Sequence, residues 1–206
     1  MAVTAYAEGF GVEDDVLVAA RNRSDELGCL PIGPGAGNAL RFLAAALDAR
    51  AVVEVGTGAG VSGLWLLAGM RADGVLTSVD TDAEHQRAAK RAFADQKVAP
   101  GRFRLINGSA SEVLPRLTDG AYDLVFVDGP KPDYQEYLTQ SLRLLRSGGV
   151  VVLAGMLGRG RIGEPSARDP ETVALREVTR TIREHEELVS LLIPLGEGLL
   201  AAVHRR

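Results

Sequence analysis

The strongest chemical signal in this sequence is a glycine-rich turn that follows one acidic residue, with a second acidic residue at the end of the next apolar run. Residues 52–60 read V-V-E-V-G-T-G-A-G, an apolar run that leads into glycines at positions 56, 58 and 60 and then into a helical pattern. Glycines let the backbone turn tightly and approach a ligand closely. Asp80 ends the next apolar run, roughly 20 residues later, where its carboxylate can accept hydrogen bonds from both hydroxyls of a ribose. Together these features predict a site for a nucleoside-type cofactor.

The glycine spacing and the position of Glu54 favour S-adenosylmethionine over NAD as that cofactor. An NAD-binding turn has its third glycine at the position where this chain has Val61. Glu54 precedes the first glycine closely, so its charge would repel a pyrophosphate and would attract the sulfonium and ammonium groups of S-adenosylmethionine.

A second group of residues, Asp128 and Lys131, could carry out the chemistry of methyl transfer. The transfer is an in-line displacement, which needs the acceptor oxygen about 3–3.5 Å from the methyl carbon. Phenol-like acceptors have a pKa of about 10, so a neighbouring group must lower that pKa or take the proton. Asp128 and Lys131 follow the apolar run 122–127 and are therefore candidate catalytic residues. A helix cap for Asp128 and a solvated surface charge for Lys131 are the alternatives.

The elements that would position these residues alternate regularly along the chain. Short apolar runs alternate with helical patterns, which predicts a parallel α/β sheet covered on both faces. The last two apolar runs are too close together for a parallel crossover, so they predict an antiparallel hairpin. The expected strands are 51–55, 75–79, 103–106, 122–127, 150–153, 188–193 and 199–203, and the expected helices are 12–27, 39–47, 61–70, 83–96, 111–117, 134–145 and 171–184.

A single domain is expected over residues 1–206. Residues 1–48 predict a helical extension that begins with a short tail and is broken by prolines and glycines at 31–35, and residues 49–206 predict the α/β core. Residues 155–170, rich in glycine and arginine, predict a mobile loop. No internal repeat and no linker divides the chain.

The composition narrows the class of protein and its surroundings. A net charge of −4 over 206 residues, with 46% hydrophobic and 24% charged residues, indicates a globular protein and argues against a nucleic-acid partner. No apolar run approaches the ~20 residues of a membrane span, and the N-terminus lacks a signal-peptide pattern. The single cysteine, Cys29, suits a reducing compartment, and the scattered His85, His185 and His204 are expected at the surface. We expect a cytoplasmic protein that acts on a small molecule, with no membrane partner.

Several segments resemble one family of enzymes. The run E-V-G-T-G-A-G-V-S-G-L-W-L at 54–66 resembles the first motif of the class I S-adenosylmethionine-dependent O-methyltransferases, and is closest to their catechol and caffeoyl-coenzyme A branch. Residues 128–134 match the D-x-x-K-x-x-Y motif of that branch. Further similar segments lie at 76–80, 108–115, 122–128, 144–149 and 194–199, the last of them resembling bacterial members, so the resemblance covers most of the chain from about Leu30 onward.

The resemblance implies a Rossmann-like methyltransferase domain with strand order 3-2-1-4-5-7-6, often assembled as a homodimer through its N-terminal helices. It also implies a set of cofactor-binding residues. The methionine part of S-adenosylmethionine would be held by Glu54, Gly56, Thr57, Gly58 and Ser62, the ribose by Asp80, and the adenine by Ser109, Ala110 and Ser111, with Asp128 at the reacting end.

The resemblance fails at one position that concerns a metal. In the family, Asp128 would be a metal ligand and Lys131 a general base or oxyanion partner, and an Asp-Asn pair after the fifth strand would supply further ligands. This chain has Ala154 and Gly155 there, and neither side chain can coordinate a divalent ion. Asp123 and Glu197 are not evident substitutes. The sequence therefore predicts methyl transfer without a tightly bound metal.

Two other functions remain open from the sequence. An NAD(P)-dependent oxidoreductase would need a Tyr-x-x-x-Lys pair or a similar proton relay, which this chain lacks. A non-catalytic S-adenosylmethionine-binding protein would retain the glycine-rich turn and Asp80 but would not turn over.

Overall fold

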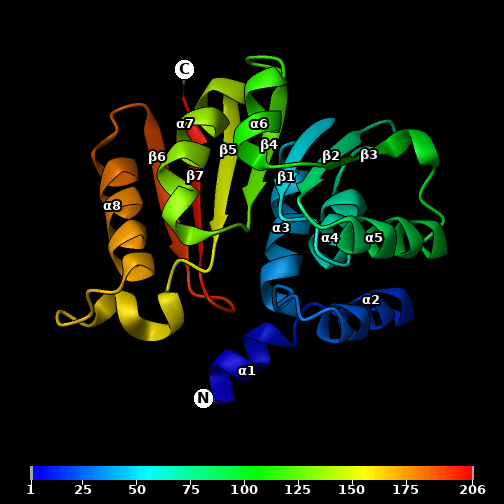
Figure 1. Ribbon diagram of the computed structural model, residues 1–206, viewed down its shortest axis with the longest axis horizontal. Coiled ribbons are helices and arrows are strands. Elements are labelled where there is room, and N and C mark those ends of the chain that lie inside the picture. The colour runs from blue at the N-terminus through cyan, green and yellow to red at the C-terminus, as the bar shows by residue number, and fades with distance from the viewer. Residues whose placement is uncertain (1, 206) are drawn as a thin grey trace.

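A seven-stranded sheet organises the computed structural model, which describes residues 2–205 (Figure 1). The strand order is β3-β2-β1-β4-β5-β7-β6, and β7 runs antiparallel to both of its neighbours, whereas the other neighbouring pairs are parallel. The strands are β1 (Ala51–Val55), β2 (Val75–Asp80), β3 (Phe103–Asn107), β4 (Tyr122–Val127), β5 (Leu145–Ala154), β6 (Leu188–Ile193) and β7 (Leu199–His204). The predicted α/β class, strand order and C-terminal hairpin are confirmed.

The pairing register brings the ends of three strands to one edge of the sheet. β1 lies between β2 and β4, with Glu54 opposite Ser78 on one side and opposite Phe126 on the other. Because the three strands are parallel, their carboxyl ends meet at the same edge. The turn after β1, Asp80 at the end of β2 and Asp128 just after β4 therefore lie near one another.

Helices cover both faces of the sheet, as expected for buried parallel strands. α3, α4 and α5 pack on the face that carries Val52, with α2 packed against α4 and α5, whereas α6, α7 and α8 pack on the face that carries Val53. Side chains alternate between the faces of a strand, so Glu54 points to the side of α4. The helices are α1 (Ala2–Glu8), α2 (Asp15–Glu26), α3 (Pro34–Ala46), α4 (Val61–Gly69), α5 (Ala83–Asp95), α6 (Ala110–Val113), α7 (Tyr134–Leu144) and α8 (Pro170–Glu184).

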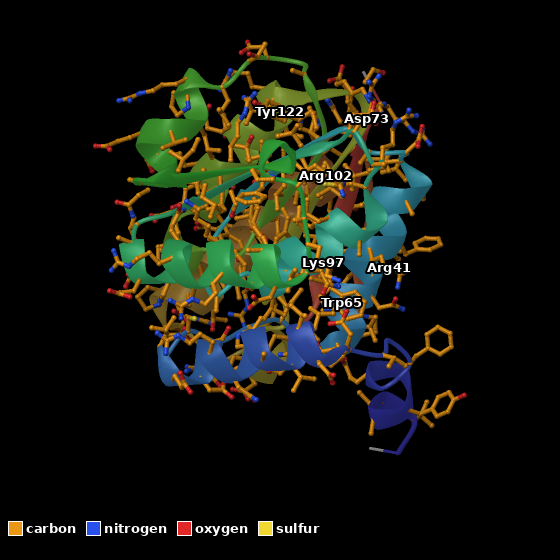
Figure 2. All side chains as sticks on the ribbon, turned by 90° about the vertical axis from the view of Figure 1, so that its right-hand side faces the viewer. Arg41, Trp65, Asp73, Lys97, Arg102 and Tyr122 are labelled. Carbon is orange, nitrogen blue, oxygen red and sulfur yellow. The ribbon has the colours of Figure 1, made fainter. Side chains whose placement is uncertain are left out.

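The N-terminal helices differ from the prediction. The expected tail contains α1, which lies apart from the sheet beneath α3 (Figure 1), and α3 begins at Pro34 rather than at residue 39. Pro34 occupies the first turn of α3, where a missing N–H removes no helical hydrogen bond. At Gly37 a Cβ would lie 2.3 Å from the indole of Trp65, which lies inside the molecule (Figure 2). Of the residues expected to break the chain, Gly33 precedes α3 as its N-cap, whereas Gly35 lies within α3, where a Cβ would lie 2.6 Å from Oε2 of Glu8.

The fifth strand also differs, because it begins at Leu145 rather than at residue 150. Its pairing with β4 shifts register between Tyr122 and Leu124, and Gly148 has a φ of 75°. A left-handed glycine absorbs this irregularity, so the strand continues through the glycines that were expected to precede it. Within the segment predicted to be a loop, Gly158–Gly163 forms 3₁₀ turns. No helix of residues 2–205 has the length and apolar character that crossing a membrane requires.

Candidate functional site

The glycine-rich turn after β1 is held in a conformation that side chains would disturb. Gly56 has a φ of 92°, and a Cβ there would lie 2.1 Å from the carbonyl oxygen of Asp128. The backbone N–H of Asp128 in turn donates to the carbonyl of Val55, at 2.8 Å. The turn is therefore locked against the end of β4, which fixes the distance between the two groups of candidate residues.

Asp80 faces the turn and has one oxygen with room for a further donor. Its Oδ2 accepts the N–H of Gly58 at 3.0 Å and faces Nδ1 of His85 at 3.3 Å, while Oδ1 accepts the N–H of Asp82 at 2.9 Å. Each carboxylate oxygen can accept about two hydrogen bonds. Asp80 is thus aligned by the backbone of the turn, with acceptor capacity left for a ligand.

His85 does not lie on the open surface as expected from the sequence. It is in the first turn of α5, which Asp82 caps by accepting the N–H of Glu84. This cap directs the His85 ring toward Asp80, where 20% of its side chain remains exposed. A lone histidine carries no pattern in a single sequence, so only the structure shows that it lies in the cavity.

Glu54 is the most unusual group of the site, because it is a carboxylate with no exposed surface. Ser62 of α4 donates a hydrogen bond to Oε1 at 2.6 Å, and Ser78 of β2 donates to Oε2 at 2.5 Å. Burial, opposed by these two hydrogen bonds and reinforced by the charges of Asp128 and Asp80, raises the pKa of Glu54 to about 7. The group can therefore change its charge near neutral pH.

A cavity of about 730 Å³ connects these residues and is called the first cavity below. Its lining includes Gly56, Thr57, Gly58, Ser62, Asp80, His85, Ser109, Ala110 and Asp128. Of the predicted adenine residues, Ser111 lies outside this lining, and its hydroxyl bonds to the phenol of Tyr137, which does line it. Glu54 lies behind the lining, below the glycine turn.

Lys131 is fixed by two acceptors at the end of β4. Its ammonium donates to the hydroxyl of Tyr134 at 2.6 Å and to Oδ1 of Asp128 at 3.3 Å, and it lies 4.6 Å from the centre of the Tyr134 ring. Burial holds the pKa of Tyr134 well above its usual range, with the charge of Asp128 adding to the shift. The Tyr134 phenol therefore stays protonated and donates a hydrogen bond to the carbonyl of Ala154, at 2.9 Å.

Gly155 makes room for this position of Lys131. Gly155 has a φ of 69°, and a Cβ there would lie 2.9 Å from both Cε and Nζ of Lys131. The ammonium thus occupies the space that a side chain at residue 155 would need. Ala154 and Gly155 offer no side-chain ligand, and residues 2–205 contain no cluster of three or more His, Cys, Asp or Glu suited to a metal ion. At the positions where the resemblance places metal ligands, Asp128 is thus the one residue whose side chain could coordinate a cation.

A second cavity, of about 630 Å³, opens beside Lys131. Ile32, Ala36, Leu175, Leu195 and Leu199 give it apolar walls, and Arg159, Arg161, Asp169, Glu171 and Glu197 bring charges to it. Glu197, distant in sequence, enters this lining because the β6–β7 turn folds back, and its carboxylate accepts the N–H of Arg159 at 3.1 Å. Leu30, Pro31, Ile32 and Asp128 border both cavities, so a molecule in one would meet a molecule in the other beside Asp128.

Comparison with known proteins identifies the group to which this arrangement belongs. Residues 10–205 match the family model of the O-methyltransferases. A Mycobacterium tuberculosis protein named "Probable O-methyltransferase" is 52% identical over 199 residues, which cover 97% of this chain and 89% of that protein.

Solved structures give the same result for the fold. A Corynebacterium glutamicum protein superposes with a TM-score of 0.92 at 30% identity, covering 100% of this chain and 96% of that one. The O-methyltransferase TomG from Streptomyces achromogenes, involved in tomaymycin synthesis and crystallised with S-adenosylmethionine, gives a TM-score of 0.89 at 27% identity, over 100% of this chain and 96% of that one. The chain therefore belongs to the O-methyltransferase family.

Proposed function

We propose that this protein transfers a methyl group from S-adenosylmethionine to the hydroxyl of a small phenol-like acceptor, without a tightly bound metal. The observation that carries the proposal is the junction of the two cavities at Asp128. A cofactor in the first cavity and an acceptor in the second would meet there, next to the ammonium of Lys131. Such alignment is the main requirement of an in-line displacement.

The charges around the first cavity support a cationic cofactor. Glu54, Asp80 and Asp128 lie at the ends of three adjacent strands, and Glu54 receives its hydrogen bonds from hydroxyls. A pyrophosphate at this turn would be repelled, whereas a sulfonium or ammonium group is attracted. Bound S-adenosylmethionine supplies the electrophilic methyl group. The ribose would bond Asp80, the methionine part would lie over Gly56, Thr57, Gly58 and Ser62 in the field of Glu54, and the adenine would lie near Ser109 and Ala110.

Lys131 is assigned to lower the pKa of the acceptor hydroxyl, so that its proton passes to solvent, and to stabilise the oxygen that then attacks the methyl group. Its contacts with Tyr134 and Asp128 are those of an ammonium donor, which favours the role of oxyanion partner over that of general base. A fixed positive charge beside a developing oxyanion is worth most in a site shielded from water. Asp128 orients this ammonium and limits its movement.

The chain is also proposed to form a homodimer through its N-terminal helices. Tyr6, Phe10 and Phe42 are 78%, 73% and 69% exposed, and they lie in or directly after α1 and in α3. Large apolar side chains gathered on one surface are typical of protein interfaces.

The cofactor assignment is tested by calorimetry with S-adenosylhomocysteine and NAD(H). Asp80→Ala removes the ribose acceptor, so we expect a loss of about 1–3 kcal/mol in S-adenosylhomocysteine affinity. Asp95→Ala, an exposed carboxylate in the last turn of α5, serves as the matched control and should bind as the wild type does. Tighter binding of NAD(H) than of S-adenosylhomocysteine would refute the assignment.

The role of Lys131 is tested by Lys131→Ala, assayed with labelled S-adenosylmethionine and a set of catechols and simple phenols. We expect the transfer rate to fall ~10²-fold or more while S-adenosylhomocysteine affinity stays nearly constant, because the charge acts on the acceptor. Lys90→Ala, on the exposed side of α5, controls for loss of a surface charge. If the wild type and Lys131→Ala transfer methyl groups at equal rates up to alkaline pH, Lys131 has no role in the reaction.

The absence of a metal requirement is tested with chelators. Turnover of the wild type should be unchanged by excess EDTA and by added Mg²⁺, since Lys131 provides the positive charge. Mg²⁺ sites commonly use one or two carboxylates together with water and substrate. Activity that EDTA abolishes and that Mg²⁺ or Mn²⁺ restores would show that a metal takes part.

The homodimer is tested by light scattering coupled to size exclusion. The wild type should elute with twice the mass of the chain, and Phe42→Asp should shift it toward monomer because it places a charge in the apolar surface. Leu192→Asp, on the exposed part of β6, is the control and should leave the dimer intact. A monomeric wild type at micromolar concentration argues against the proposed dimer.

A further inference from the structure

Behind the glycine turn, a row of buried polar side chains connects α5 to Glu54. Gln86 is in the first turns of α5, Thr57 lies in the glycine turn, and Ser78 is on β2, and all three are at most 8% exposed. Nε2 of Gln86 lies 3.2 Å from Oγ1 of Thr57, Oγ1 of Thr57 lies 2.7 Å from Oγ of Ser78, and Oγ of Ser78 lies 2.5 Å from Oε2 of Glu54. Neither Ser78 nor Gln86 belongs to a motif that would indicate a role from the sequence.

The direction of these hydrogen bonds is determined at the α5 end. Nε2 of Gln86 also lies 2.9 Å from the carbonyl oxygen of Ile106, which can only accept, so the atom in this place must be the donating nitrogen of the amide. Gln86 therefore donates to Thr57 as well. The Thr57 hydroxyl can then donate its hydrogen bond to Ser78, and the Ser78 hydroxyl donates to Glu54. Every donor in the row points toward the carboxylate.

A row with this direction favours the charged form of Glu54. A proton on Oε2 would make that oxygen a weaker acceptor for the Ser78 hydroxyl. If the row reversed, Thr57 would accept from both Gln86 and Ser78, and its own hydroxyl would lose Ser78 as an acceptor. Hydrogen bonds in a chain also polarise one another, which strengthens the last of them. Burial and the neighbouring charges of Asp80 and Asp128 act in the opposite direction. Those two carboxylates face His85 and Lys131 respectively.

We propose that Gln86, Thr57 and Ser78 are positioning residues, whose one-directional hydrogen bonds end on Glu54 and keep its negative charge available to a cationic cofactor. The proposal rests on the proposed function for the identity of the cofactor, but the row itself exists in the ligand-free chain. These residues act through Glu54. They explain how a carboxylate can be held without exposure beneath a turn where the cofactor carries positive charge.

The first test uses the ligand-free protein, so it does not depend on the cofactor. Infrared difference spectra between pH 5 and pH 9 should contain a carboxylic C=O band that Glu54→Gln removes. In the wild type this band should titrate at about 7. In Ser78→Ala the midpoint should rise by about one pH unit, because the charged form loses a hydrogen bond and the neutral form does not. A midpoint that stays the same or falls overturns the proposal.

The second test compares two ligands by calorimetry. S-adenosylhomocysteine carries an ammonium group and 5′-methylthioadenosine lacks it. For the wild type, S-adenosylhomocysteine affinity should increase as pH rises through about 7, because the carboxylate then forms. At pH 7.5, Ser78→Ala should weaken S-adenosylhomocysteine by roughly 10-fold and 5′-methylthioadenosine by less than about 2-fold, as expected for loss of one hydrogen bond to a charged group. Equal losses for both ligands would show a merely structural role.

Two further variants keep the tests decisive. Thr77→Val removes a buried hydroxyl from the opposite face of the same strand and should change neither the midpoint nor the ligand preference. Gln86→Leu changes the far end of the row. It should shift the infrared midpoint and the ligand preference in the same direction as Ser78→Ala, but by less. If Ser78→Ala does not fold, Gln86→Leu is the variant on which the two tests are made. If S-adenosylhomocysteine does not bind at all while the infrared midpoint shifts, the proposed cofactor is wrong and the row is still supported.

Discussion

The burial of Glu54 is the constraint on which the arrangement of the site depends. A carboxylate in the centre of a parallel sheet is costly unless hydrogen bonds or an opposite charge compensate it. This chain surrounds it with hydroxyls from α4 and β2, which reach it only because β1 and β2 pair in the register that sets Glu54 opposite Ser78. The same register fixes the glycine turn and Asp80. The buried position of Glu54 on β1 therefore depends on the placement of both β2 and α4.

Much of the fold could be predicted from the sequence because buried parallel strands leave a clear pattern. Nearly continuous apolar runs such as 51–55 and 122–127, each with a single acidic residue, have few other interpretations, and the short spacing of the last two runs requires a hairpin. The boundaries that were wrong involve glycine and proline. In α3, Gly37 allows close packing against Trp65, and in β5, Gly148 takes a left-handed conformation where the strand is irregular. A single sequence does not distinguish these uses of glycine from a chain break.

The candidate site could be predicted where one segment carries the whole signal. The turn with its flanking acids and the Asp128 to Tyr134 stretch are local motifs, and the structure brings them to one edge. Contacts that depend on how one element docks on another were not predictable: His85 of α5 beside Asp80 of β2, Gln86 behind Thr57, and Glu197 in the wall of the second cavity. Each depends on how a helix or a hairpin docks, and no residue type at those positions signals it.

The contact between Gly155 and Lys131 also determines what a new residue at position 155 would change during evolution. A Cβ there would lie 2.9 Å from Cε and Nζ of Lys131, and because these atoms are the far end of a flexible side chain, the lysine would move while the backbone stayed in place. Gly155 also has a left-handed backbone, which any other residue adopts at a cost. A substitution that brought a metal ligand to this position would therefore keep the lysine in the chain but displace its ammonium from Tyr134 and Asp128. One mutation would thus alter the ligand set and the charge arrangement of the site together.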